Sequence, residues 1–205
     1  MPTSSSVQFF ESQFQRQVAA GTLELNPFEK ACLPYLKGRV LDFGCGVGNL
    51  AIAAARSGCS VLALDASPTA MAYLRNVASK EKLRIDAVQA DLRAYELEQD
   101  FDAVVSIGLL MFFDCPTALR QLAMLQAHVW PGGTAIVNVL VEGTTFLDMF
   151  DAQGYCLFGR DEMLKRFAGW SILSSEYQEF PAPGGTVKAF ATVVAQKPMQ
   201  PCAGA

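Results

Sequence analysis

Three glycines separate an apolar run from an alanine-rich run in the segment VLDFGCGVGNLAIAAA, residues 40–55. The apolar run is typical of a buried strand and the alanine-rich run of a helix, so Gly44, Gly46 and Gly48 predict the turn between them. Glycines at such a turn can allow a tight bend, a close helix–strand crossing, or a ligand that lies against bare backbone. These three roles make different demands on the residues that follow.

Strand-like and helix-like segments alternate along the rest of the chain. Strands are expected at about 38–42, 60–65, 83–91, 101–108 and 134–141, with helices at 49–58, 67–80 and 116–129 and a turn at 130–133. This alternation predicts an α/β fold in which helices cover both faces of a mostly parallel sheet. Two strand-like segments, 170–180 and 186–196, flank the turn PAPGG, so we expect one of them to run antiparallel.

Composition favours one folded domain. The 205 residues are 51% hydrophobic and 18% charged, which is typical of a globular protein rather than a disordered one. We expect a single domain over residues 1–205, with a helical lead-in at 1–37 that contributes to the substrate side. The net charge of −4 and scattered basic residues argue against a nucleic-acid partner. No apolar run reaches the roughly 20 residues of a membrane helix, and no secretory signal is visible. We therefore expect a cytoplasmic monomer or homodimer.

The six cysteines are far apart and only one histidine is present. A metal site needs a cluster of such ligands, so we expect no metal. Reduced, mostly buried thiols are the favoured interpretation, with disulfides as the alternative.

Acidic residues stand where three of the predicted strands end. Asp42 precedes the glycines, and Asp65 and Asp91 end the next two strands. Ligands of open parallel sheets bind beyond the carboxyl ends of the strands, so these side chains should meet there. A carboxylate so close to a bound pyrophosphate would repel it by a few kcal/mol, whereas it would attract a cation. Asn49 also stands where a dinucleotide loop carries its third glycine or alanine. S-adenosylmethionine, which carries a sulfonium and an ammonium but no phosphate, fits this pattern better than NAD.

Two of these acids and one of the glycines also have purely structural interpretations. Asp65 can begin the turn into the next helix, Asp91 can terminate its strand, and Gly48 can serve close helix packing.

The strings LDFGCGVGNLA, VLALDAS, VQADL and WPGGTAIV, in this order, resemble the class I S-adenosylmethionine-dependent methyltransferases over roughly residues 25–197. The strings LLMFFD, FGRDEMLKRFAGW and VKAFATVVAQKP resemble, more narrowly, the tellurite-resistance methyltransferase family. The resemblance implies a Rossmann-like sheet of seven strands with the last strand antiparallel. It implies S-adenosylmethionine as cofactor, bound by Asp42, Gly44, Gly46, Asp65, Ala66, Asp91, Leu92, Ser106 and Ile107.

The chain departs from the tellurite family at the final hairpin. That family carries a His-Arg pair before the hairpin and a further arginine in the last strand. Here YQEFPAPGG contains neither residue, and Ala189 stands at the expected arginine position. The departure argues against an oxyanion such as tellurite as the substrate.

Aromatic residues dominate the expected substrate region: Met111, Phe112, Phe113, Phe146, Phe150, Tyr155 and Phe158. They can equally be core or lid residues. The candidates for a general base are weak: Asp114, Asp148 and Tyr155. A nucleophile that ionises unaided near neutral pH, such as a thiol or selenol, needs no strong base. We therefore expect a small-molecule methyltransferase for a soft or apolar acceptor. The alternatives are a non-catalytic S-adenosylmethionine-binding module and an NAD-dependent oxidoreductase.

Overall fold

The computed structural model describes residues 5–21, 24–151 and 154–199. Its seven-stranded sheet has the order β3-β2-β1-β4-β5-β7-β6. The strands are β1 (Arg39–Phe43), β2 (Ser60–Asp65), β3 (Ile85–Gln89), β4 (Phe101–Ile107), β5 (Val129–Leu140), β6 (Ser171–Ala182) and β7 (Thr186–Gln196). The pairs from β3 to β5 are parallel, and β7 is antiparallel to both β5 and β6. The predicted mostly parallel sheet with an antiparallel last strand is confirmed.

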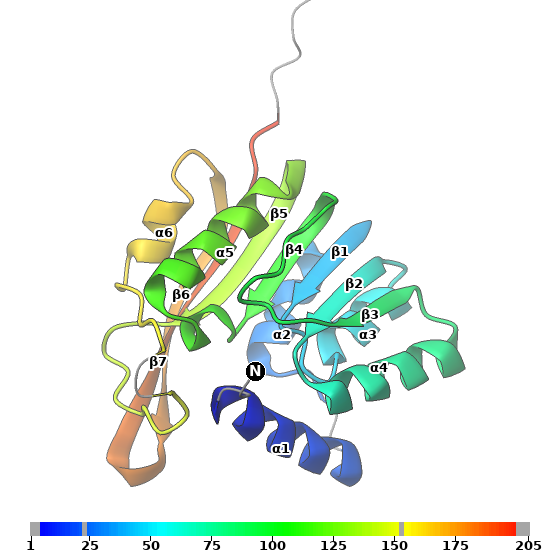
Figure 1. Ribbon diagram of the computed structural model, residues 1–205. Coiled ribbons are helices and arrows are strands. Elements are labelled where there is room, and N and C mark those ends of the chain that lie inside the picture. The colour runs from blue at the N-terminus through cyan, green and yellow to red at the C-terminus, as the bar shows by residue number, and fades with distance from the viewer. Residues whose placement is uncertain (1–4, 22–23, 152–153, 200–205) are drawn as a thin grey trace, which may run out of the picture.

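Helices cover both faces of this sheet (Figure 1). They are α1 (Ser5–Ala20), α2 (Pro27–Cys32), α3 (Asn49–Arg56), α4 (Pro68–Glu81), α5 (Cys115–Ala127) and α6 (Glu162–Arg166). Residues of α5 and α6, such as Leu122 and Met163, join one hydrophobic core. Residues of α3 and α4, such as Leu50 and Met71, join the other. The central strands β1, β4 and β5 are therefore buried on both sides, which explains their continuous apolar runs.

Local sequence signals account for several helix starts. Ser67 caps α4 by accepting a hydrogen bond from the Ala70 amide, with Pro68 in the first turn. Asn26 and Glu29 form a capping box at α2. Asp114 caps α5 by accepting from the Thr117 amide at 2.9 Å. No helix in the described ranges is long and apolar enough to cross a membrane.

Two predictions about local structure are wrong. Residues 130–133 do not separate the preceding helix from a strand but lie within β5, where the pairing with β4 shifts from Phe101–Val129 to Ala103–Thr134. The other concerns the cysteines, because Cys115 and Cys156 form a disulfide. Their sequence separation of 41 gives no local signal; the fold brings the start of α5 against the long segment between β5 and α6. Cys32, Cys45 and Cys59 are buried free thiols.

Candidate active site

The glycine loop joins β1 to α3 in a conformation that favours glycine. Gly44, Gly46 and Gly48 have φ values of +85°, +53° and +84°. A Cβ atom on Gly44 would lie 2.8 Å from Leu109, and one on Gly48 would lie 2.6 Å from Leu74 of α4. Gly44 and Gly46 line the cavity beside the loop, whereas Gly48 is absent from its wall. Gly48 thus serves helix packing, as its structural interpretation suggested.

Asp65 ties the end of β2 to the glycine loop. One carboxylate oxygen accepts a hydrogen bond from the Gly46 amide at 2.8 Å, and the other accepts from the Ser67 amide at 2.9 Å. Burial raises the pKa of this carboxyl, and the backbone hydrogen bonds oppose the rise. Asp65 is therefore held rigidly at the edge of the cavity, with lone pairs left for a ligand.

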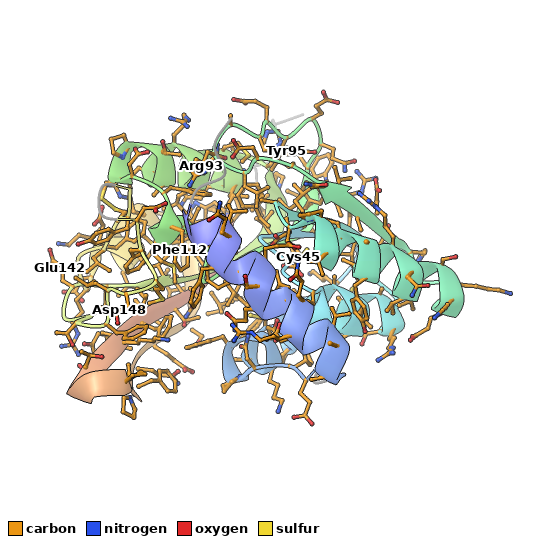
Figure 2. The ribbon with its side chains drawn as sticks, turned by 60° about the horizontal axis from the view of Figure 1, so that its bottom comes forward. Cys45, Arg93, Tyr95, Phe112, Glu142 and Asp148 are labelled. Carbon is orange, nitrogen blue, oxygen red and sulfur yellow. A yellow bond between two sulfur atoms is a disulfide. The ribbon has the colours of Figure 1, made fainter. Side chains whose placement is uncertain are left out.

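A cavity of about 1040 Å³ extends from the glycine loop, past the ends of β4 and β5, to the β6–β7 hairpin. Single small-ligand pockets usually occupy about 300–1,000 Å³, so this one has room for a cofactor and a second small molecule. In Figure 2, α1 crosses the molecule beside Phe112 and Cys45, which both belong to the cavity wall. The two ends differ in chemistry: acids gather at the glycine loop, and aromatic rings at the hairpin.

Helix α1 covers the glycine loop. The ring of Phe14 lies 3.1 Å from where a Gly46 Cβ would be, and Phe10 packs edge-on against Phe112 at 5.0 Å between centroids. Glu11 accepts hydrogen bonds from the hydroxyls of Ser67 and Thr69 at the start of α4. Helix α1 therefore packs on the cavity wall both at the glycine loop and at Phe112.

Asp42 is buried in the wall next to the loop, with 5% of its surface exposed. Its Oδ2 has no hydrogen-bond partner among the described residues. Burial, with the nearby carboxylates of Glu29 and Asp65, raises its pKa to about 8. An unpaired acid among other acids fits a cationic ligand, since a cation would neutralise the charge that the protein leaves unbalanced. An anionic pyrophosphate would add to the repulsion.

The structure brings together most of the predicted cofactor residues. Those in the wall of the cavity are Asp42, Gly44, Gly46, Asp65, Ala66, Asp91, Leu92 and Ile107. Asp91 is exposed and accepts a hydrogen bond from the Arg93 amide at 3.1 Å. Ser106 is the exception: it is fully buried and outside the wall, because it lies on the same face of β4 as the core residue Val104. Its side chain does not reach the cavity.

The predicted substrate residues divide into two layers. Met111, Phe112, Phe113 and Phe146 line the cavity. Phe150 packs behind Phe112 at 5.0 Å, and Tyr155 stacks on Phe150 at 4.7 Å. Phe158 is wholly buried in the core and does not reach the cavity.

Several residues of the cavity wall were not predicted from the sequence. They come from α1, α2, β5, the segment after β5 and the β6–β7 hairpin: Phe10, Phe14, Phe28, Glu29, Asn138, Met149, Phe180, Lys188 and Phe190. The alternation of side chains along β7 could have identified Lys188 and Phe190 as one face. Nothing in the sequence places that face beside the glycine loop.

None of the candidate bases reaches the cavity. Asp114 caps α5, and hydrogen bonds from Thr117 hold its pKa below the usual range. Asp148 is exposed on the segment after β5, at the periphery of the molecule and apart from Cys45 in Figure 2. Tyr155 is stacked in the second layer. His128, at the end of α5, lies 2.9 Å from Asp100, and neither residue is in the cavity wall. The substrate end thus lacks an obvious proton acceptor among the described residues.

Comparison with known proteins agrees with this site. Residues 40–133 match the family model described as "Methyltransferase domain". Over 78% of the chain, the sequence is 29% identical to "Hemagglutinin 1" of Eikenella corrodens. Over the same share it is 25% identical to "Probable S-adenosyl-L-methionine-dependent methyltransferase TehB" of Haemophilus influenzae (strain 10810). The chain spans only 55% and 57% of the length of these curated relatives. The crystal structure of H. influenzae TehB superimposes with a TM-score of 0.72, covering 92% of this chain and 67% of that one at 20% identity.

The sheet order, the glycine loop and the domain match over residues 40–133 are features that the chain shares with the class I S-adenosylmethionine-dependent methyltransferases. Within that class it is similar to TehB. S-adenosylmethionine is the cofactor of this class, and it fits the unpaired Asp42 and the acids around the loop. Asp42, Asp65 and Asp91, with the backbone of Gly44 and Gly46, are the residues that would hold it.

Proposed function

We propose that the protein transfers a methyl group from S-adenosylmethionine to a small molecule with a soft or apolar acceptor, such as a thiol or another chalcogen compound. The observation that carries the proposal is the aromatic end of the cavity, which adjoins the acidic cofactor end and contains none of the candidate bases. The cover that α1 forms over the glycine loop supports a small acceptor rather than a macromolecular one.

The cofactor supplies an electrophilic methyl group on a sulfonium, so the chain's task is to hold the acceptor in line and to exclude water. A thiol has an ordinary pKa of about 8.5, so it binds mostly in its neutral form and loses its proton to solvent before the methyl group moves. The thiolate lone pair then forms the bond to the methyl carbon, and the electrons of the broken bond remain on the cofactor's sulfur. The two charges cancel in this step, so an apolar cavity wall favours it.

The test is release of S-adenosylhomocysteine with a panel of thiols, selenols, halides, phenols and amines. We expect turnover with the thiols and selenols, rising with pH as the acceptor ionises. Phe112→Ala should raise the KM for the acceptor, whereas Trp130→Ala, at an exposed aromatic residue outside the cavity wall, serves as a control. Turnover confined to amines or to macromolecules would contradict the proposal.

A second candidate function is a cofactor-binding module without turnover. The observation that favours it is the same lack of a proton acceptor at the substrate end. Calorimetry distinguishes the two: binding of S-adenosylmethionine with no methyl transfer to any acceptor class would support the module.

A further inference from the structure

We propose that the substrate end of the cavity selects an organic acid. The ligand that fits this end of the cavity has three parts. They are a hydrogen-bond donor at the inner end, near Asn138 of β5, an apolar body the size of a ring, and an anionic group at the outer end, near Lys188 of β7. This inference rests on the proposed function, since it specifies the acceptor of the same site.

The inner end is defined by Asn138 of β5. This residue is 1% exposed and lies in the cavity wall, in register with Ile107 of β4. Its Nδ2 donates to the Thr192 hydroxyl of β7 at 2.8 Å, while its Oδ1 has no partner among the described residues. A buried acceptor without a donor costs free energy that a ligand donor would recover. Asn138 thus points to an O–H, S–H or N–H group at this end.

The middle of the cavity is apolar. Phe28 of α2, Phe180 of β6 and Phe190 of β7 all contact one another, with centroid distances of 4.9–5.9 Å. All three rings line the cavity. Such a wall favours an aromatic or aliphatic body over a polar one.

The outer end is defined by Lys188 of β7. Its Nζ lies 4.7 Å from the centre of the Phe146 ring, and it forms no ion pair with any described acid. Lys188 is half-buried, and a partly desolvated ammonium attracts an anion more strongly than a solvated one does. Thr192, the partner of Asn138, lies four positions after Lys188 in β7, which is about 13 Å along the strand.

This cation stands beside the position where the tellurite family's arginine was expected. Ala189 is fully buried and faces the core, because side chains alternate along the strand, whereas Lys188 faces the cavity. Glu29 is near Asp42 on the cofactor side and would repel an anion there. The charge distribution therefore places the anionic group at the hairpin, remote from the methyl donor.

The first experiment compares 3-(4-mercaptophenyl)propanoate with its methyl ester as acceptors. For the wild type we expect kcat/KM about tenfold higher for the acid, as for a charge-assisted contact. The ratio should fall to about one in Lys188→Met and persist in Lys188→Arg. It should also persist in Lys80→Met, a control on the exposed side of α4. An equal rate for acid and ester in the wild type, or an unchanged ratio in Lys188→Met, would overturn the inference.

The binding of these ligands to the complex of the protein with S-adenosylhomocysteine tests this inference without requiring methyl transfer, so the two proposals can fail independently. Calorimetry with the S-methylated acid and ester should show the same preference for the acid. For Asn138, we expect 3-(4-hydroxyphenyl)propanoate to bind roughly 3- to 10-fold more tightly than 3-phenylpropanoate, a gain that Asn138→Leu abolishes. Preferred binding of the acid without methyl transfer would refute the proposed function alone. Equal binding of acid and ester would refute this inference alone.

Discussion

At the scale of single residues, the site contains a carboxylate that destabilises the empty protein. Asp42 has a pKa of about 8, against an ordinary value of 3.8, because it is buried beside Glu29 and Asp65. Folding therefore takes up a proton between about pH 4 and pH 8. Since the folded state then binds more protons than the unfolded state, stability falls as pH rises through this window. A bound cation reverses the cost, because it favours the ionised carboxylate.

Asp42→Asn should exchange affinity for stability. We expect the variant to be more stable than the wild type by about 1–3 kcal/mol at pH 8, with a smaller gain at pH 5, where the native side chain is protonated. Its affinity for S-adenosylmethionine should be at least about tenfold weaker at pH 7.5, with less difference at pH 6. Urea unfolding and calorimetric titration across this range measure both effects. Asp86→Asn, on an exposed part of β3, is the matched control. If the stability and the cofactor affinity depend on pH equally in the wild type and in Asp42→Asn, the raised pKa does not belong to Asp42.

Asp65→Ala should weaken cofactor binding by about 1–3 kcal/mol, the cost of charge-assisted hydrogen bonds. The carboxylate also receives the Gly46 and Ser67 amides, so the variant should lose some stability as well. Calorimetry on the folded variant, with its melting temperature measured separately, distinguishes the two losses. An unchanged affinity would remove Asp65 from the site.

At the scale of elements, the disulfide fixes the segment between β5 and α6, which contributes Phe146 and Met149 to the cavity wall. Cys156 follows Phe146 and Met149 in this segment and is buried. Its sulfur is bonded to that of Cys115 at the start of α5. The Cys156 amide also donates to the Met111 carbonyl at 3.0 Å. The two contacts hold the segment against the short helix Leu110–Phe112, which lines the cavity.

Removal of the disulfide should lower stability by about 2–4 kcal/mol, since it closes a loop of 41 residues. The double variant Cys115→Ser/Cys156→Ser should unfold at lower urea concentration than the oxidised wild type. Adding a reductant should bring the wild type close to the double variant and leave the double variant unchanged. A wild type whose unfolding midpoint does not respond to reductant would contradict the prediction.

The elements themselves were largely predictable, because their signals are local. Ser67 with Pro68 marks the start of α4, and the strands 60–65 and 186–196 agree with the segments expected from the sequence. The prediction of a turn at 130–133 was wrong. Pro131 and two glycines are typical of a turn, but in the structure these residues lie within β5, where its pairing with β4 is irregular. Asp114 was a candidate base from the sequence, whereas the structure shows it as the cap of α5.

At the scale of the whole molecule, cofactor binding should stabilise the fold by mass action. S-adenosylmethionine or S-adenosylhomocysteine at 100 times its Kd adds about 2.7 kcal/mol to the free energy of unfolding. For a chain of this length that is a rise in Tm of roughly 5–10 °C. NADH should give no rise, because its pyrophosphate would meet Asp42. A thermal shift with NADH alone would reverse the choice between methyltransferase and oxidoreductase.

The sequence by itself determined the sheet, the glycine turn and the acids at the strand ends, because these depend on side-chain period and on chain order. Parallel strands bring their carboxyl ends to one edge, so Asp42, Asp65 and Asp91 were predictable as neighbours before their contacts were known. Only the tertiary structure decided what lies opposite them. The antiparallel insertion of β7 brings Lys188 and Phe190 to the cavity and Thr192 to Asn138, and the path of the chain after β5 brings Cys156 to Cys115. Such pairings join residues tens of positions apart through packing, and packing leaves no periodic signal in the sequence.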